Sequence, residues 1–277
     1  MILQALKQYS ERIEGLPPYG FNREQIKYRL VINLDGSFCG IMPCEEHERI
    51  EVPINPSAGK TGIDPKPSFL WGSTEYIFGI MPQKKYKHPE KRGKFAQELF
   101  WKLNKEVLNT IEDEAANAVL KFSEKVDEIF EDNKEELKKA GDDKCLLVLN
   151  NKGEIEYIQD RKVIREAWLK YLKQPEKEEG KKKRKTGKKS NNIAFCLVNG
   201  QRSKIARLHK PKIVGVGKKP GPNSPAYLVA FDDDAFCSYG RTPNDRGMNA
   251  PVSEEAVAAY TAALNYLLDF KNGQTIR

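Results

Sequence analysis

Three hairpin signals constrain the fold of this 277-residue chain more than any other feature. Each consists of a short Gly-containing turn between two runs that are rich in apolar and β-branched residues. The turns are Asp35-Gly36, Asn151-Lys152-Gly153 and Asn199-Gly200. Because Asp-Gly and Asn-Gly readily adopt the positive φ angles of tight turns, we expect neighbouring strands to pair in a mainly antiparallel sheet.

Apolar residues at helical spacing surround these hairpins. They predict an N-terminal helix within residues 1–15 and two helices in an insertion at about 93–140. A further helix is predicted at 161–172, with Asp160 as its N-cap, and a last helix is predicted to begin after the N-cap Ser253.

Three more segments read as strands because β-branched and aromatic residues dominate them. They are residues 49–54, 226–231 and 69–80, the last with an irregularity at Gly72-Ser73-Thr74. The predicted fold class is therefore α+β, a hairpin-built, mainly antiparallel sheet with a helical insertion and flanking helices.

The length suits one large domain or two small ones. A stretch without apolar residues separates the second and third hairpins. We therefore expect one α+β domain made of a lobe 1–175 that contains the helical insertion, a basic loop 176–192 and a lobe 193–277.

Charge is concentrated in one segment. Residues 180–231 contain no Asp or Glu and fourteen Lys or Arg, whereas the net charge of the whole chain is +8, so the rest carries −6. A mildly acidic protein with one cationic segment is typical of a protein that binds a polyanion, above all nucleic acid. A solvated basic loop is the alternative for the lysine run alone, which comprises Lys181, Lys182, Lys183, Arg184, Lys185, Lys188 and Lys189.

Five cysteines without a C-x-x-C pattern, and three histidines without metal-site spacing, argue against a disulfide framework and a zinc site. No apolar run reaches the roughly 20 residues that span a bilayer, and no signal-peptide pattern is present at the start. We expect a cytoplasmic protein that needs no metal or cofactor and no membrane.

Three motifs resemble catalytic or nucleotide-binding patterns but depart from them. A phosphate-binding loop at Ser57–Thr61 would need glycine where Ile54 stands, and a dinucleotide fingerprint from Gly215 would need glycine at Pro220. Asp232-Asp233-Asp234 has the residue type of a metal-dependent nuclease but lacks an accompanying His or Glu motif. The sequence therefore predicts no enzyme.

Polar and cationic residues in the hairpins and Gly-rich loops are candidate contacts to duplex DNA. Arg202 and Lys204 share a face of the third hairpin if the strand is regular, and Arg207 points to the other face. A two-stranded ribbon can approach a DNA groove. The full set of candidates is Lys60, Thr61, Lys66, Ser73, Thr74, Arg202, Lys204, Arg207, Lys218, Lys219 and Asn223, with the lysine run of 181–189 as a source of nonspecific phosphate attraction.

Several long segments resemble one protein family in the same order. They include VPINPSAGKTGIDPKPSFLWGSTEYIFG, CLLVLNNKGEIEYI, IARLHKPKIVGV, YLVAFDDDAFCSYG and NAPVSEEAVAAYTAALNYLL. On these segments the chain is similar to the large subunit of the subtype I-C CRISPR surveillance complex, Cascade, over essentially its whole length.

The resemblance implies a function. Such large subunits bind the protospacer-adjacent motif of invading double-stranded DNA and help to open the duplex, so that guide RNA can pair with the target strand. The implied partners are this DNA, guide RNA, other Cascade subunits and a helicase-nuclease that the full complex recruits. The large subunit itself is not expected to be a nuclease.

Two departures from the family pattern matter. Members of the family run to several hundred residues, so this chain is expected to be the N-terminal portion. The family often has Asp-Asn-Thr after the Trp, where this chain has Gly72-Ser73-Thr74, and the amide of an Asn is lost there. Two alternatives stay open, a metal-dependent nuclease acting through Asp232 to Asp234, and a scaffold that binds guide RNA and partner subunits.

Overall fold

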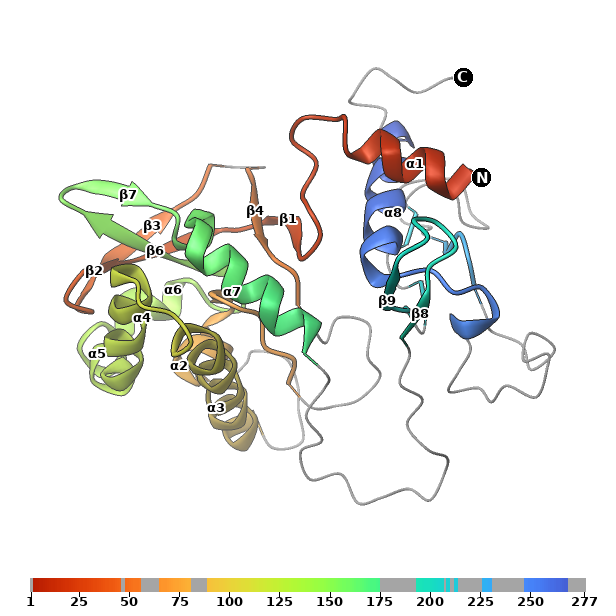
Figure 1. Cartoon of the computed structure of the whole chain (residues 1–277). Helices are drawn as coiled ribbons and strands as arrows, with labels where there is room; N and C mark the ends of the chain where they lie inside the picture. Colours follow the sequence, from red (N-terminus) through yellow and green to blue (C-terminus); the bar gives the residue numbers. More distant parts are fainter. Residues whose placement is uncertain are drawn as a thin grey trace. The chain divides into compact units, whose positions relative to one another are not determined.

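The computed structural model describes residues 2–45, 48–55, 65–80, 89–174, 193–206, 208–209, 212–213, 226–230 and 247–268. The chain forms two compact units. We call residues 20–175 the sheet unit, and residues 1–19 together with 176–277 the hairpin unit. The sequence assigned residues 1–19 to the first lobe, whereas the structure places them with the last hundred residues (Figure 1).

The sheet unit is built on a five-stranded sheet in the order β3-β2-β6-β5, with β7 paired to β6. Its strands are β2 (Tyr28–Asn33), β3 (Phe38–Pro43), β5 (Trp71–Gly72), β6 (Cys145–Asn151) and β7 (Glu154–Glu156). All pairs are antiparallel except β2 with β6, which is parallel. The predicted α+β class with a mainly antiparallel sheet is confirmed.

The first two hairpins form where the turn residues predicted them. Gly36 has φ +82°, and the backbone N–H and hydroxyl of Ser37 both donate to the Asp35 carboxylate, at 2.9 and 2.6 Å. A side chain at Gly36 would also place its Cβ 2.5 Å from the Cβ of Lys121. In the second turn Gly153 has φ +95°. These angles favour glycine, and they explain why the local sequence specified the turns.

The sheet is buried on both faces along its central strands, β2 and β6. Along β6, Cys145, Leu147 and Leu149 belong to the apolar cluster shared with the helices, while Leu146 and Val148 belong to a second cluster on the other face. That second face is covered by Ile50 and Val52 of β4 (Arg49–Pro53) and by Ile26, which follows β1 (Phe21–Gln25). Strands β1 and β4 pair with each other antiparallel. Strand β4 confirms the prediction for residues 49–54. Alternate residues of a strand point to opposite faces, so an unbroken apolar run marks a strand covered on both sides.

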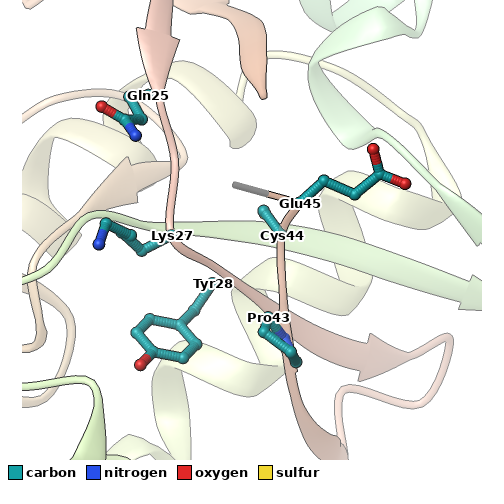
Figure 2. Close-up of a pocket in the computed structure, with 6 residues that line it drawn as sticks. All are labelled: Gln25, Lys27, Tyr28, Pro43, Cys44 and Glu45. Carbon is teal, nitrogen blue, oxygen red and sulfur yellow. The ribbon is translucent and has the colours of Figure 1, made fainter. Parts of the chain in front are cut away.

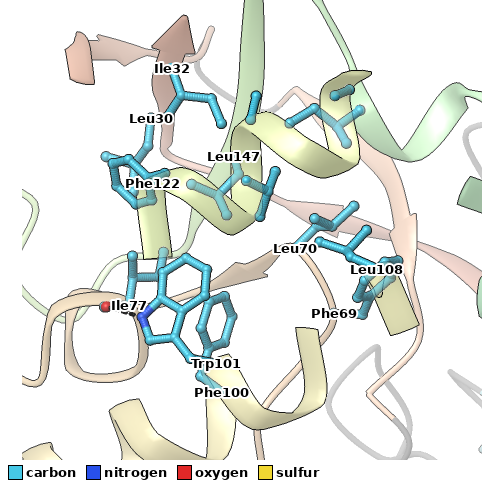
Figure 3. Packing of buried hydrophobic residues seen from close by; sticks show 14 of the residues in the cluster. Leu30, Ile32, Phe69, Leu70, Ile77, Phe100, Trp101, Leu108, Phe122 and Leu147 are labelled. Atoms are coloured by element: carbon cyan, nitrogen blue, oxygen red, sulfur yellow. Dashed lines mark hydrogen bonds between the residues drawn. The ribbon is translucent and has the colours of Figure 1, made fainter. Parts of the chain in front are cut away.

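The helices of this unit supply its largest core (Figure 3). They are α2 (Thr74–Phe78), α3 (Pro89–Leu108), α4 (Glu114–Glu124), α5 (Val126–Asp132), α6 (Lys134–Lys139) and α7 (Lys162–Lys173). The predicted helical insertion is confirmed, although α3 to α6 occupy the segment where two helices were expected. In Figure 3 the indole N–H of Trp101 donates to the carbonyl of Ile77 at 2.9 Å, which fastens α3 to α2.

Three local predictions are wrong. Residues 69–80 form only the two-residue β5 and then the helix α2. Asp160 does not cap α7, whose N-cap is Arg161; the Asp160 carboxylate lies 3.5 Å from the guanidinium of Arg165 instead. Within the described part of 226–231, Ala226 makes a single bridge to Ile213 and no strand forms.

The hairpin unit joins the third predicted hairpin to the two terminal helices. Strand β8 (Ile193–Phe195) pairs antiparallel with β9 (Arg202–Lys204), and Gly200 in the turn has φ +69°. Helix α1 (Ile2–Ser10) packs on α8 (Glu254–Leu268). The predicted cap of α8 is confirmed, because the backbone N–H of Ala256 donates to the Ser253 hydroxyl at 3.2 Å.

An ion-pair network ties three elements of the sheet unit together. The guanidinium of Arg161 binds Glu156 of β7 at 2.6 Å and Asp113 at 2.9 Å, and Asp113 also caps α4. A third carboxylate, that of Glu114, lies 3.1 Å away. The hydrogen bonds from Arg161 hold the pKa of Glu156 below its ordinary value.

Replacing Arg161 by Met is expected to destabilise the chain by about 2–4 kcal/mol at pH 7, because three carboxylates lose their cation. The depressed pKa of Glu156 contributes stability that is complete above the ordinary carboxyl value of 4.5 and is lost as the pH falls further. The measurement is urea unfolding of wild type and Arg161→Met at several pH values. The difference between their free energies of unfolding should become smaller as the pH falls below about 4.5. Exposed Lys162, replaced by Met, is the matched control, and an equal loss there would contradict the role of the network.

Candidate nucleic-acid interface

The described candidates fall into two groups in different units. Lys66, Ser73 and Thr74 lie in the sheet unit, and Arg202 and Lys204 lie in the hairpin unit. The other predicted contacts lie outside the described residues, namely Lys60, Thr61, Arg207, Lys218, Lys219, Asn223 and the lysine run of 181–189. The alternative site at Asp232 to Asp234 lies outside them too.

Lys66 and Ser73 are positioned beside helix α2. The backbone N–H of Lys66 donates to the Tyr76 hydroxyl at 3.0 Å, and its carbonyl accepts from the Asn55 side chain at 2.7 Å. Ser73 is the N-cap residue of α2 with extended backbone, and its half-buried side chain makes no capping hydrogen bond. The backbone around both residues is thus fixed, while the Ser73 hydroxyl is not used in capping its helix.

Thr74 is a correction to the candidate set. Its side chain is only 2% exposed, and its hydroxyl donates to the carbonyl of Gly141 at 2.5 Å. A buried hydroxyl in such a bond stabilises the fold, and breaking that bond would leave a carbonyl unsatisfied. The structure therefore assigns Thr74 a role in holding α2 and leaves the half-buried Ser73 as the more accessible hydroxyl of the turn.

The backbone just before this turn is strained. Leu70 is fully buried and has φ +65°, a conformation that is costly for a branched side chain. Its N–H donates to the side-chain oxygen of buried Asn104 at 2.9 Å, and the Asn104 amide donates to Phe100 at 2.8 Å. Asn104 thus holds the backbone of Leu70, which precedes β5 and the turn with Ser73. Asn104 was not among the predicted site residues, and its only signal in the sequence is an amide on the apolar side of a helix.

A buried ion pair neutralises Glu75, the acidic residue nearest to Ser73 along the chain. The Glu75 carboxylate in the first turn of α2 lies 2.8 Å from the guanidinium of Arg92 in α3. An uncompensated carboxylate there would repel a phosphate near Ser73. The pair removes that repulsion, and sequence reasoning could not connect two residues that lie seventeen positions apart in different helices.

The third hairpin presents its cations as predicted. Arg202 and Lys204 are both exposed on one face of β9, and Ser203 between them is half-buried on the other. The Lys204 ammonium lies 3.3 Å from the Glu254 carboxylate, which reduces its net effect. Among the described residues no carboxylate pairs with Arg202. Arg202 is therefore the stronger candidate for an anionic partner.

Histidine does not add to the positive charge of this unit at neutral pH. His209 is 2% exposed, and its Nδ1 lies 2.7 Å from the Tyr260 hydroxyl. Burial lowers the pKa of His209 to about 4, so the ring is neutral near pH 7. The cationic character of the hairpin unit comes from Lys and Arg alone.

The sheet unit contains a small pocket, drawn in Figure 2. It has a volume of about 210 Å³ and lies where β1 turns into β2 beside the end of β3; its lining residues are Gln25, Lys27, Tyr28, Pro43, Cys44 and Glu45. Pockets for small molecules usually have volumes of about 300 Å³ or more. None of the predicted DNA contacts that the structure describes lines it. Within the described ranges no cluster of His, Cys, Asp and Glu could hold a metal ion, and no helix is long and apolar enough to cross a bilayer.

A comparison with protein-family models identifies the chain's relatives. Residues 4–277 match the model of the CRISPR-associated protein Cas_Csd1. The chain belongs to the Cas_Csd1 family. A comparison with curated proteins gave no match. Membership makes this Cas_Csd1 protein a CRISPR-associated protein of the Cascade type, which agrees with the coarse form of the resemblance found in the sequence.

Proposed function

We propose that this Cas_Csd1 protein is the DNA-binding large subunit of a subtype I-C Cascade. It recognises the protospacer-adjacent motif of double-stranded DNA and assists opening of the duplex for pairing with guide RNA. Its further partners are the other Cascade subunits and a helicase-nuclease recruited by the full complex. The protein itself performs no catalysis.

The observation that carries this proposal is the acid-free segment in a chain of this family. Fourteen cations and no acids occur within 180–231, and two of the cations, Arg202 and Lys204, are held on the exposed face of a folded ribbon. Cations that neutralise phosphates release counterions, which drives association with nucleic acid of any sequence. Fixed cations on a ribbon can in addition set the register of the duplex.

Motif reading is assigned to the turn that carries Ser73. Its hydroxyl can donate and accept, and its backbone is fixed by the strained Leu70 before it and by its carbonyl, which accepts from the N–H groups of Tyr76 and Ile77 in α2. Serine offers fewer groups than the asparagine that the resemblance places here. We therefore expect this turn to discriminate fewer bases than an Asn-containing turn would.

The test is binding of the full chain to a pool of duplexes with a randomised segment, with magnesium present, at 50 and 200 mM salt. If three to four phosphates are contacted, affinity should fall by about 40- to 150-fold between the two conditions. One short motif should be enriched, and Ser73→Ala should flatten that enrichment without changing the salt dependence.

Other results would count against the proposal. If the affinity did not depend on salt, or if no motif were enriched, motif recognition would be contradicted. The alternative of a scaffold that binds guide RNA and partner subunits would then be favoured. Cleavage of DNA that Asp233→Ala abolishes would show a metal-dependent nuclease instead.

A further inference from the structure

On the outer face of the β8–β9 hairpin, strand β8 is apolar where a half-buried strand would normally be polar. Ile193, Phe195 and Leu197 are 47, 70 and 57% exposed. The alternate residues, among them Cys196 and Val198, are buried in the core that β8 shares with α8. One face of the hairpin therefore packs on the core of the hairpin unit. The apolar residues on its other face contribute little to that core.

Strand pairing places a cation opposite each of the first two apolar residues. Phe195 pairs with Arg202, and Ile193 pairs with Lys204. Side chains directly opposite on an antiparallel pair have Cβ atoms about 5 Å apart, so the phenyl ring and the guanidinium lie within reach of one ligand. Among the described residues no other ring stacks on Phe195. An exposed aromatic ring beside a guanidinium without an ion pair is the combination that binds unpaired bases.

The charge around the hairpin selects the kind of partner. The hairpin lies in the middle of the segment that has fourteen cations and no acids, which favours a polyanion. Paired bases in a duplex hide their flat faces within the stack, whereas bases of a single strand expose them. A polyanion that also offers flat apolar faces is single-stranded nucleic acid.

We propose that the outer face of this hairpin is a stacking platform for an unpaired nucleobase. Phe195 stacks on the base, and Arg202 contacts an adjacent phosphate. This inference rests on the proposed function and extends it, because it gives the chain an affinity for opened DNA that is distinct from its affinity for the duplex. Lys204 remains close to Glu254 and contributes less.

The test compares the full chain on a paired duplex and on the same duplex with a central unpaired bubble that contains the fluorescent base 2-aminopurine. Wild type should bind the bubble at least about fivefold more tightly than the duplex, and stacking should quench the fluorophore. Phe195→Leu keeps an apolar side chain but removes the ring, so it should lose the preference and the quenching while duplex affinity changes less than about twofold.

Two further variants separate the roles. Ile193→Ala removes an exposed apolar side chain from the same face and should keep the preference. Arg202→Gln should weaken binding to both DNAs, because phosphates are present in each.

The outcomes separate this inference from the function on which it rests. A wild-type chain that binds the duplex without preferring the bubble, or a preference that survives in Phe195→Leu, would overturn the stacking platform alone. Loss of assembly with other Cascade subunits in Phe195→Leu, with bubble binding intact, would show a protein-docking face and overturn it too. A wild-type chain that binds neither DNA would overturn the proposed function with it.

Discussion

Replacing the seven cations of Lys181 to Lys189 by Gln is expected to weaken binding to every duplex alike, by on the order of 10³-fold at 50 mM salt. Each phosphate contact contributes about 0.9 to the slope of log affinity against log salt, so the loss of about three contacts has this effect. Titration of several unrelated duplexes at three salt concentrations should show a parallel loss and a shallower slope. The ratio between motif-bearing and scrambled duplexes should stay unchanged.

The chain offers a control of equal charge in the helical insertion. Seven exposed lysines there lie among a larger number of acidic residues, and they are Lys91, Lys94, Lys102, Lys121, Lys125, Lys138 and Lys139. Replacing these by Gln should change duplex affinity much less, because a locally acidic surface is not a phosphate-binding surface. Equal losses in the two variants would mean that only net charge matters.

Asn104→Leu is expected to destabilise the sheet unit by about 2–4 kcal/mol. The substitution keeps the branching at Cγ but leaves the buried N–H of Leu70 without its acceptor, in a backbone conformation that already carries strain. Chemical denaturation should report this as a lower midpoint. Since Asn104 also directs the turn that carries Ser73, motif enrichment should weaken in the fraction that remains folded.

Asn109→Leu provides the comparison for this substitution. Asn109 is exposed just after the end of α3, so the same chemical change should alter stability by less than about 0.5 kcal/mol. Asn104→Leu with wild-type stability would show that Leu70 keeps its conformation without the side-chain bond. The strain at Leu70 would then have another cause.

Short sequence patterns predicted the turns and one helix cap, because those features depend on residues close together in the chain. The turn at Gly36 requires a positive φ angle that two adjacent residues encode, and the cap Ser253 lies within three residues of the N–H that it accepts. The parallel pairing of Tyr28 with Cys145 joins strands separated by more than a hundred residues. No short sequence pattern specifies which distant strand pairs with which. The strands could therefore be predicted from the sequence, but their order in the sheet could not.

The segment 69–80 shows how two signals competed. Its aromatic and β-branched residues favour a strand by composition. Its Ser73 at the N-cap and Gly79 with φ +69° at the C-cap bracket one helical turn, and the structure follows the caps. The incorrect strand prediction also led to the wrong exposure for Thr74. In a regular strand Ser73 and Thr74 would point to opposite faces, and either could have been the exposed one.

The candidate site was predictable in kind and only partly in detail. The alternation of Arg202 and Lys204 on one face follows from strand geometry, and it is confirmed. Their different surroundings are not local, because Glu254 comes from a helix fifty residues later along the chain. Phe195 was overlooked because a phenylalanine in an apolar run reads as core, and only the packing shows which face the core uses.

The membership of α1 in the hairpin unit has a consequence for biosynthesis. Helix α1 leaves the ribosome before the sheet unit does, yet its partner α8 begins more than 240 residues after α1 ends. At about 5–20 residues per second, α1 waits roughly 12–50 s with Leu3, Leu6 and Tyr9 uncovered. The whole sheet unit is synthesised before α8, so we expect the sheet unit to fold first and the hairpin unit second. In the interval the exposed apolar face of α1 is expected to bind chaperones.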